Sequence, residues 1–187
     1  MPQLNDAPGA GSTLEGFDPV WHPHARVLVL GSMPGVRSLQ EQQYYAHPRN
    51  AFWPIMRRLV GADPTLSYCR RVEILRRQGI ALWDVIAACQ RPGSLDSRIR
   101  PETVAPNDFQ WLFVRCPAIE RIAFNGRAAE ALFQRHVLAE LPPALAAIPR
   151  LRLPSTSPAY AAMSMEQKAM LWHEALAPFC GNRHDID

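Results

Sequence analysis

Residues 26–30 (RVLVL) constrain the fold more than any other segment of this 187-residue chain. The run is short and nearly all apolar, and it stops at the tight turn sequence 31–35 (GSMPG). A strand without polar alternation is buried on both faces, which is typical of a central strand in a parallel sheet covered by helices. The sequence therefore predicts a sheet with a helical layer on each side.

Three further runs share this pattern, and segments with helical spacing lie between them. The strand-like runs are residues 80–86, 119–124 and 151–153, and the helical segments are residues 52–60, 66–78, 108–115, 128–136 and 165–178. This alternation predicts an α/β fold, a three-layer open sheet of about four mostly parallel strands with helices on both faces. We expect an irregular N-terminal segment over residues 1–24, a single domain over 25–180 and a tail over 181–187.

Composition favours a globular protein without a membrane or secretion segment. Nearly half of the residues are apolar and a fifth are charged, and no run approaches the roughly 20 apolar residues of a membrane span. The net charge of +3 does not by itself indicate a nucleic-acid partner. The four cysteines (Cys69, Cys89, Cys116 and Cys180) form no Cys-x-x-Cys pair, so we expect neither a zinc site nor an iron–sulfur cluster. Cys69 and Cys89 are predicted to be buried as small apolar side chains.

Three of the predicted strands end in small or polar turns. These turns are residues 31–35, Asn125 with Gly126, and residues 154–158 (PSTSP). Ligands of open α/β sheets bind outside the carboxyl ends of the strands, so we expect the three turns to form one site. After the first turn, residues 44–53 crowd aromatic residues, a histidine and an asparagine directly before a helix. Core packing has little use for that mixture.

The first turn and residues 44–53 (YYAHPRNAFW) resemble the first active-site motif of the uracil-DNA glycosylase superfamily, and residues 154–159 resemble its second. The similarity extends from about Val27 to Trp172, and it is greatest to the branch of hypoxanthine (deoxyinosine) DNA glycosylases. The resemblance implies a monofunctional enzyme of base-excision repair that flips out a deaminated base and hydrolyses its N-glycosidic bond. Hypoxanthine is the expected base, with uracil, xanthine and mismatched thymine left open.

One departure from the mismatch-directed uracil and thymine branch affects the catalytic group. That branch carries an asparagine at the position of Met33 to hold the attacking water, and a methionine side chain cannot do this. The resemblance to the hypoxanthine branch implies a catalytic role for Asn50, which either positions water or contacts the base. Ser32 and His47 are further catalytic candidates, and the backbone N–H groups of Ser32 and Met33 are suited to the departing base.

The remaining predicted site residues divide between the base and the DNA backbone. Phe52 is the expected stacking face, with Tyr44 or Tyr45 as the second wall. The turn after the last strand is expected to grip phosphates through Ser155 and Thr156, and Tyr160 or Met163 to enter the base stack as a wedge. The base-binding candidates are Gly31, Met33, Pro34, Gly35, Tyr44, Tyr45, Phe52 and Asn125, and the DNA-contacting candidates are Ser155, Thr156, Ser157, Pro158, Ala159 and Tyr160.

Lys168 is the only lysine among the 20 basic residues, and its amphipathic surroundings predict that it faces solvent. A glycosylase that also cuts the strand forms a Schiff base through an amine. Unless the N-terminal amine serves, we expect water to be the nucleophile, with no strand cleavage. No metal or cofactor is expected. The expected partner is double-stranded DNA with a damaged base, bound by a monomer in the cytoplasm that associates with the nucleoid through DNA; no membrane partner is expected.

Several residues allow a purely structural interpretation beside the functional one. His47 can line the site or be a core histidine bonded to backbone, and Asp84 can point onto the rim or cap a turn. Residues 93–98 can approach DNA or form an ordinary surface turn. The tryptophans interpreted as core are Trp53, Trp83, Trp111 and Trp172. The arginine pairs interpreted as a solvated helix face are Arg70 with Arg71 and Arg76 with Arg77. The possible phosphate contacts are Arg49, Arg98 and Arg100.

Two other functions are compatible with the sequence. The first is a serine hydrolase with Ser32 as nucleophile, His47 or His173 as base and Asp84 as orienting group. Against it, the chain has no Gly-x-Ser-x-Gly elbow, and the proline and glycine of the turn leave no helix start immediately after Ser32. The second is a non-catalytic nucleotide- or nucleic-acid-binding module on the same fold.

Overall fold

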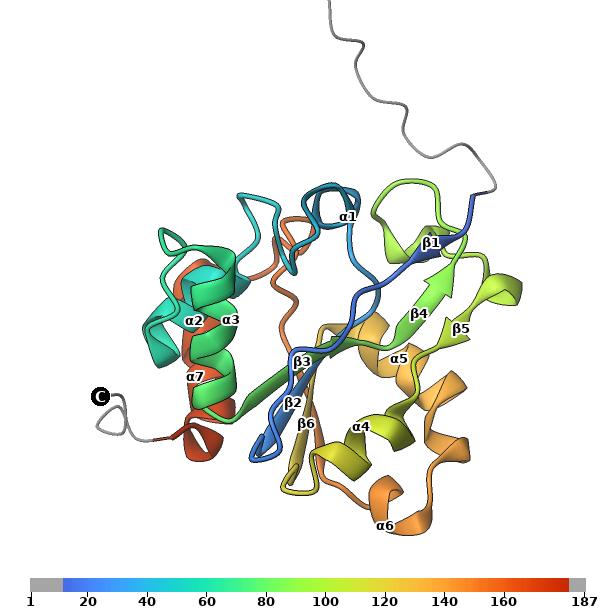
Figure 1. Ribbon diagram of the computed structural model, residues 1–187. Helices are drawn as coiled ribbons and strands as arrows, with labels where there is room; N and C mark the ends of the chain where they lie inside the picture. Colours follow the sequence, from blue (N-terminus) through green and yellow to red (C-terminus); the bar gives the residue numbers. More distant parts are fainter. Residues whose placement is uncertain (1–11, 182–187) are drawn as a thin grey trace, which may run out of the picture.

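The computed structural model describes residues 12–181, which fold around a central sheet of four parallel strands (Figure 1). The strands lie in the order β3–β2–β6–β7. Their bounds are Val27–Gly31 for β2, Ile80–Asp84 for β3, Arg121–Asn125 for β6 and Arg150–Leu153 for β7. The four predicted strands are thus confirmed, with small shifts of their boundaries.

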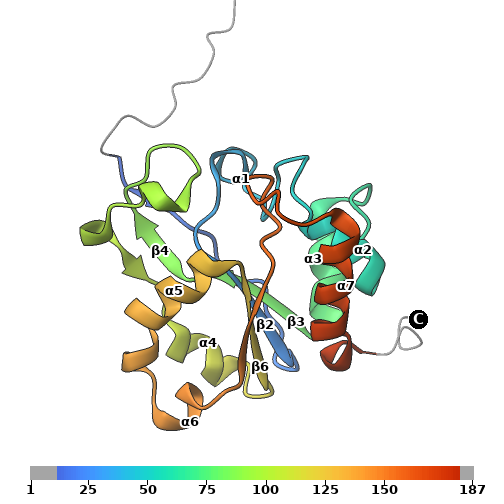
Figure 2. The same cartoon turned by 180° about the vertical axis from the view of Figure 1, so that it is seen from behind.

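Helices cover both faces of this sheet. Helices α2 (Phe52–Val60), α3 (Tyr68–Arg77) and α7 (Met165–Leu176) pack on one face, and α4 (Phe109–Arg115), α5 (Arg127–His136) and α6 (Pro143–Ala146) lie on the other (Figures 1 and 2). Helix α1 (Val36–Glu41) stands at one end of the sheet. Single 3₁₀ turns span Asp96–Arg98, Pro101–Thr103, Leu138–Glu140 and Ala177–Phe179. The predicted three-layer α/β architecture is therefore confirmed.

The parallel register gives the carboxyl ends of the strands a common edge. Strand β2 pairs residue by residue with β3, from Val27 opposite Ile80 to Gly31 opposite Asp84, and pairs with β6 on its other side. Every residue of β2 and β3 is buried, as expected for strands covered on both faces. The ends of β2, β3 and β6 consequently bring Gly31, Asp84 and Asn125 to the same edge of the sheet.

A small antiparallel sheet lies beside the main one and was not predicted. It consists of β1 (Leu14–Glu15), β4 (Ile86–Cys89) and β5 (Ala105–Pro106), in the order β1–β4–β5. The predicted strand 80–86 is divided at Val85. There the N–H groups of Val85 and Ile86 donate to the carbonyls of Gly31 and Ser32 (2.9 and 3.1 Å), and the chain leaves the parallel sheet to pair with β1.

The N-terminal segment is more ordered than expected. Leu14 and Val20 are buried, and Val20 exchanges backbone hydrogen bonds with Leu82 of β3 (2.8 Å each). The ring of Trp21 packs edge-on against Trp111, with centroids 5.8 Å apart. The expectation of an irregular surface segment up to residue 24 is therefore wrong at Leu14–Glu15 and at Val20, which pair with other strands, whereas most of residues 12–24 are irregular; residues 1–11 lie outside the described residues.

Three side chains lie in surroundings other than those predicted. Lys168 is 6% exposed instead of facing solvent, because its Nζ donates to the carbonyl of Tyr160 (2.7 Å), and burial lowers the pKa of its ammonium group. Arg71 is also buried, with its guanidinium 4.3 Å from the ring centroid of Trp53. Cys69 is exposed, whereas Cys89 is buried as predicted.

The remaining assignments of core and surface hold with two exceptions, Trp111 and the half-buried Arg76. Trp53, Trp83 and Trp172 are buried as predicted, and Trp111 is only partly buried at the edge of the core. Arg70 and Arg77 are exposed, in keeping with a solvated helix face. Within residues 12–181, each helix is too short or too polar to cross a bilayer.

Candidate active site

A cavity of about 360 Å³ opens at the carboxyl edge of the parallel sheet. The turn after β2, residues 44–50, the loop after β4 and the turn after β7 contribute most of its wall. All the site residues predicted from the sequence line it except Phe52, Ala159 and Tyr160. The lining residues are Gly31, Ser32, Met33, Pro34, Gly35, Val36, Arg37, Ser38, Gln40, Tyr44, Tyr45, His47, Asn50, Asp84, Ser94, Asp96, Asn125, Ser155, Thr156, Ser157 and Pro158.

Thr156 joins the three segments that carry most of the predicted site. Its N–H donates to Oδ1 of Asn125 (2.9 Å), while Nδ2 of Asn125 donates to its Oγ1 (2.8 Å). Its carbonyl accepts the N–H of Ala51 (2.9 Å), directly before α2. Because Thr156 is only 1% exposed, these bonds are shielded from water. They tie the end of β6, the turn after β7 and the start of α2 into one unit.

This arrangement narrows the expected roles of two residues. Thr156 uses one N–H and one lone pair of the Asn125 amide, so Asn125 orients the turn after β7 and keeps one N–H and one lone pair for a base. The backbone N–H of Thr156 is occupied and cannot bind a phosphate, whereas a contact through its hydroxyl stays a prediction. Ser155 and Ser157 are half-buried in the cavity wall, where Oγ of Ser155 accepts the N–H of Ser157 (3.2 Å).

Two glycines allow close approaches at this edge. A Cβ on Gly31 would lie 2.2 Å from Oδ1 of Asp84, and a Cβ on Gly126 would lie 2.9 Å from Cβ of Ser155. Gly126 also has a φ of 93°, which side chains other than glycine rarely adopt. The absence of a side chain at these two positions lets Asp84 and Ser155 pack directly against backbone.

Asn50 presents a hydrogen-bond donor to the cavity. Its Oδ1 accepts the N–H of Phe52 (3.0 Å), the first residue of α2. That bond leaves Nδ2 as the polar group of Asn50 that is available to a ligand. His47 lines the cavity as expected, and its Nδ1 accepts the N–H of Arg49 (3.1 Å), which places the proton of a neutral ring on Nε2.

Tyr45 supplies the aromatic wall of the cavity. Phe52 is fully buried and does not line it, so the prediction that Phe52 forms the stacking face is wrong. The ring of Tyr45 packs against Phe52, with centroids 4.2 Å apart and planes inclined by 30°. Tyr45 has a φ of 55°, a left-handed conformation that is costly for a bulky residue and persists where the surrounding structure imposes it. Tyr44 also lines the cavity, but its hydroxyl donates to the carbonyl of Asp18 (3.2 Å).

Asp84 and Tyr45 bring unpartnered polar atoms to the cavity wall. Asp84, at the end of β3, is 3% exposed and lines the cavity, which favours the functional alternative left open above. Its Oδ2 is buried without a hydrogen-bond partner among the described residues, and the buried hydroxyl of Tyr45 lies near the Asn125 side chain without forming a hydrogen bond of regular geometry. Burial, reinforced by Asp96 and opposed by Arg91, raises the pKa of Asp84 to about 7. Because buried polar groups are nearly always paired, these two atoms mark where a ligand would bind.

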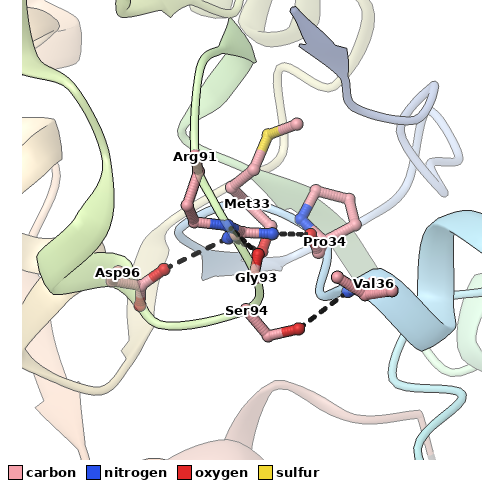
Figure 3. A network of polar contacts seen from close by, with 7 residues as sticks. All are labelled: Met33, Pro34, Val36, Arg91, Gly93, Ser94 and Asp96. Atoms are coloured by element: carbon pink, nitrogen blue, oxygen red, sulfur yellow. Dashed lines mark hydrogen bonds and ion pairs between the residues drawn. The ribbon is translucent and has the colours of Figure 1, made fainter. Parts of the chain in front are cut away.

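Arg91 connects the loop after β4 to the turn after β2 (Figure 3). Its Nη1 and Nη2 donate to the carbonyls of Met33 (3.4 Å) and Pro34, and its Nε donates to the carbonyl of Gly93 (3.0 Å). Its Nη1 also pairs with Oδ1 of Asp96 (3.5 Å). The loop therefore lines the site, and its interpretation as an ordinary surface turn is wrong.

Sequence reasoning missed Arg91, and only weak signals pointed to it. The residue follows a strand end and precedes a Pro-Gly pair, with Asp96 five positions later, a pattern that does not reveal which carbonyls the guanidinium reaches. The same loop supports α1, because Oγ of Ser94 accepts the N–H of Val36 (2.9 Å). Turn, loop and helix thus form one rigid part of the wall.

The geometry does not assemble a serine hydrolase relay. His173 is exposed on α7 and does not line the cavity, and no hydrogen bond joins Ser32 to His47 within residues 12–181. As expected, no helix starts immediately after Ser32, because α1 begins only at Val36, beyond the proline and glycine of the turn. In the described part of the chain, no group of three His, Cys, Asp or Glu side chains could hold a metal ion.

Comparisons with known proteins identify the family of the chain. A sequence model of the uracil DNA glycosylase superfamily matches residues 19–177. Two proteins named hypoxanthine DNA glycosylase are similar to the chain. The one from Methanosarcina barkeri (strain Fusaro / DSM 804) is 39% identical over 114 residues, 60% of this chain and 71% of the relative. The one from Methanosarcina acetivorans is 38% identical over 115 residues, 61% of this chain and 72% of the relative. The solution NMR structure of a candidate uracil DNA glycosylase from M. acetivorans superimposes with a TM-score of 0.66 at 30% identity, covering 87% of this chain and 98% of that one.

Replacement of Asp84 by Asn should raise stability more at high pH than at low pH. Because burial raises the pKa of Asp84 to about 7, the native state retains a proton that the unfolded chain, with a carboxyl pKa of about 3.9, releases. Wild-type stability therefore falls between about pH 4 and 7, by roughly 1.4 kcal/mol for each pKa unit of the shift. The asparagine variant has no such loss.

Thermal melts of both proteins at about pH 5 and about pH 8 measure this effect. We expect the Tm advantage of Asp84→Asn to grow by at least about 3 °C between the two conditions. Glu174→Gln, on an exposed residue of α7, is the control. An unchanged Tm difference would contradict the raised pKa of Asp84.

Proposed function

Because this chain belongs to the uracil DNA glycosylase superfamily, we propose that its cavity holds a deaminated base flipped out of double-stranded DNA, with hypoxanthine preferred. The chain is a DNA glycosylase of base-excision repair. The preferred base and the residue roles below are proposals. The observation that carries them is the cavity, in which Thr156 brings Asn50 and the turn after β7 around one space. The name shared by the two Methanosarcina relatives supports hypoxanthine.

The wall of the cavity replaces the stacking that a base loses outside the duplex. Flipping costs roughly a few kcal/mol, which the pocket must return. The Tyr45 ring, held against the buried Phe52, offers an aromatic surface that cannot swing away. A cavity of about 360 Å³ is of the size that encloses a small ring ligand.

The two unpartnered polar groups match the edge of hypoxanthine. This purine carries an N–H at N1 beside a carbonyl oxygen at C6, whereas adenine carries an acceptor at N1 beside an amino group. An oxygen of Asp84 can accept the N1–H while the hydroxyl of Tyr45 donates to O6, so that both groups gain the partner they lack. With adenine, an ionised Asp84 would face another acceptor, whereas a neutral Asp84 could donate to N1, so rejection of the normal base should be strongest above the raised pKa of about 7.

Asn50 is assigned to the departing base. Cleavage of the C1′–N9 bond leaves negative charge on the purine, and preorganised donors stabilise such charge strongly in a water-poor site. The Nδ2 donor of Asn50, with the N–H groups of Ser32 and Met33, would serve this purpose. Water is the proposed nucleophile, because Nζ of Lys168 is bound to the carbonyl of Tyr160 and Lys168 does not line the cavity.

The rim of the cavity provides contacts for the flanking DNA. Pro158 and Ala159 are exposed after the half-buried Ser157, and we assign this turn to the phosphates and bases beside the lesion. The ring of Tyr160 lies over Nζ of Lys168 (5.0 Å to the centroid), so Met163 is the less restrained wedge candidate. Three exposed arginines, Arg49, Arg98 and Arg100, are available for phosphate. We propose that the enzyme acts as a monomer on nucleoid DNA in the cytoplasm.

A panel of duplexes tests the substrate. Each duplex carries hypoxanthine, uracil, xanthine or a mismatched thymine, and alkali after incubation reveals abasic sites. We expect product from the hypoxanthine duplex at the highest rate, because its N1–H and O6 match Asp84 and Tyr45. A faster reaction with uracil would overturn the choice of base, and absence of product from all four duplexes would overturn the proposed function.

Asn50→Ala should lower the single-turnover rate by about 100- to 1,000-fold, the usual effect of removing one donor to a developing anion. Asn50→Asp, which keeps an oxygen for the N–H of Phe52 but replaces the donor by a carboxylate, should be at least as impaired. Gln110→Ala, on an exposed residue of α4, is the control. Wild-type rates for Asn50→Asp with intact folding would contradict a donor role.

No strand cleavage should accompany base removal. Since the one lysine is held away from the cavity by Tyr160, borohydride added during turnover should trap no covalent protein–DNA complex, and strands should break only after alkali. The Lys168→Gln variant is the matched control. A trapped complex that disappears in this variant would show that Lys168 reaches the sugar.

A further inference from the structure

We infer that Asp96 is a catalytic residue whose carboxylate faces the sugar of the flipped nucleotide, stabilises positive charge at C1′ and takes a proton from the attacking water. Arg91 is the positioning residue that holds this carboxylate in place. The inference rests on the proposed function of the cavity and adds the group that acts on the sugar side of the bond.

Cleavage of the glycosidic bond develops negative charge on the base and positive charge on the sugar. The electron pair of the C1′–N9 bond leaves with the base, so the sugar becomes cationic as the base becomes anionic. Asn50 and the backbone N–H groups serve only the base, because a donor does not stabilise a cation. The oxygen of water then bonds to C1′ and its proton passes to a carboxylate, while the departed base takes up one proton from solvent. The sugar side of the site therefore needs an anion.

Two carboxylates line the cavity, and their accessibility separates their roles. Asp84 is 3% exposed at the end of β3, whereas the side chain of Asp96 is 34% exposed. A flipped base enters the cavity first and its sugar stays nearer the duplex. The buried carboxyl of Asp84 is thus placed for the base edge, and the more accessible carboxylate of Asp96 for the sugar.

The turn after β2 supplies no anion of its own. Residues 31–35 contain no acidic side chain, and Met33 is apolar, 5% exposed and packed in a small cluster with Leu14, Ile86 and Cys89. The loop after β4 brings a carboxylate to the same turn from the other side. Figure 3 shows the guanidinium of Arg91 between Asp96 and the Pro34 carbonyl.

Arg91 holds the carboxylate of Asp96 in place and stabilises its ionised form. Its side chain is fully buried, and its bonds to Met33, Pro34 and Gly93 leave it one orientation. Burial raises the pKa of Asp96, and the Ser32 hydroxyl and Arg91 oppose that rise. The cation therefore favours the ionised form of Asp96 in a place where burial alone would favour the neutral acid.

Two DNA probes test the sugar contact by binding alone. One duplex carries a positively charged pyrrolidine in place of the lesion's deoxyribose, and the other carries a neutral tetrahydrofuran. The wild-type protein should bind the charged probe more tightly, and Asp96→Asn should lower that preference by about tenfold or more, the size expected from loss of one close charge pair. Glu102→Gln, the loss of an exposed carboxylate outside the cavity lining, should retain the preference.

Kinetics on the hypoxanthine duplex provide the second readout. Asp96→Asn should lower the maximal single-turnover rate by at least about 100-fold, the range of a lost general base. The protein concentration that gives half of that maximal rate should be unchanged. Glu102→Gln, an exposed carboxylate after the same loop and outside the cavity lining, should behave as wild type. A wild-type rate or an intact preference for the charged probe in Asp96→Asn overturns the inference. A wild type that excises no base overturns the proposed function instead.

Variants of Arg91 test whether this residue acts through the Asp96 carboxylate or only stabilises the loop after β4. Arg91→Met should lower the rate without raising KM and should add little to Asp96→Asn in the double variant, because both act through one carboxylate. Arg91→Lys, which keeps the charge, should recover part of the rate. Fully additive losses would overturn the positioning role, and if Arg91→Met fails to fold, the Asp96→Asn results decide.

Discussion

The cavity depends on the hydrogen bonds of one buried threonine. The N–H of Thr156 donates to Asn125 at the end of β6, and its hydroxyl accepts from the same side chain. Its carbonyl accepts the N–H of Ala51, directly before α2. These bonds join segments that lie 31 residues apart or more along the chain. In a buried place each unmade bond would cost about 1–3 kcal/mol, so the three segments are stable only together. The position of Asn50 follows from that constraint.

The polar wall combines charges that are individually unfavourable in a protein interior. Oδ2 of Asp84 is buried without a hydrogen-bond partner within residues 12–181, Arg91 is buried with one carboxylate and three carbonyls, and Asp96 is the more exposed of the two acids. A low effective dielectric strengthens every interaction among these groups and with a bound nucleotide. The buried acid and the acid paired with Arg91 thus differ in environment, which suits a reaction that develops opposite charges on the base and the sugar.

The sequence predicted the elements and the shared rim of turns, because both follow from local patterns. Helix α2 lies where the spacing of apolar residues placed it, and the turns ending β2, β6 and β7 surround one cavity. The sequence did not predict burial correctly where a residue far away in the chain covers the side chain. An amphipathic pattern could not show that Tyr160 covers Lys168 or that Trp53 covers Arg71. Likewise, nothing local distinguishes Phe52 from Tyr45 as the residue that reaches the cavity, since the unusual backbone of Tyr45 is imposed by its surroundings.

The backbone of Tyr45 holds an aromatic ring in position before any ligand arrives. With a φ of 55°, the residue carries local strain on the order of 1–3 kcal/mol, and the packing of its ring against Phe52 offsets that strain. Glycine would relieve the strain, but the loss of a packed aromatic side chain costs roughly 3–5 kcal/mol. The same contact with Phe52 therefore stabilises the fold and keeps the ring from leaving the wall, so firmness and readiness for a ligand come from one side chain.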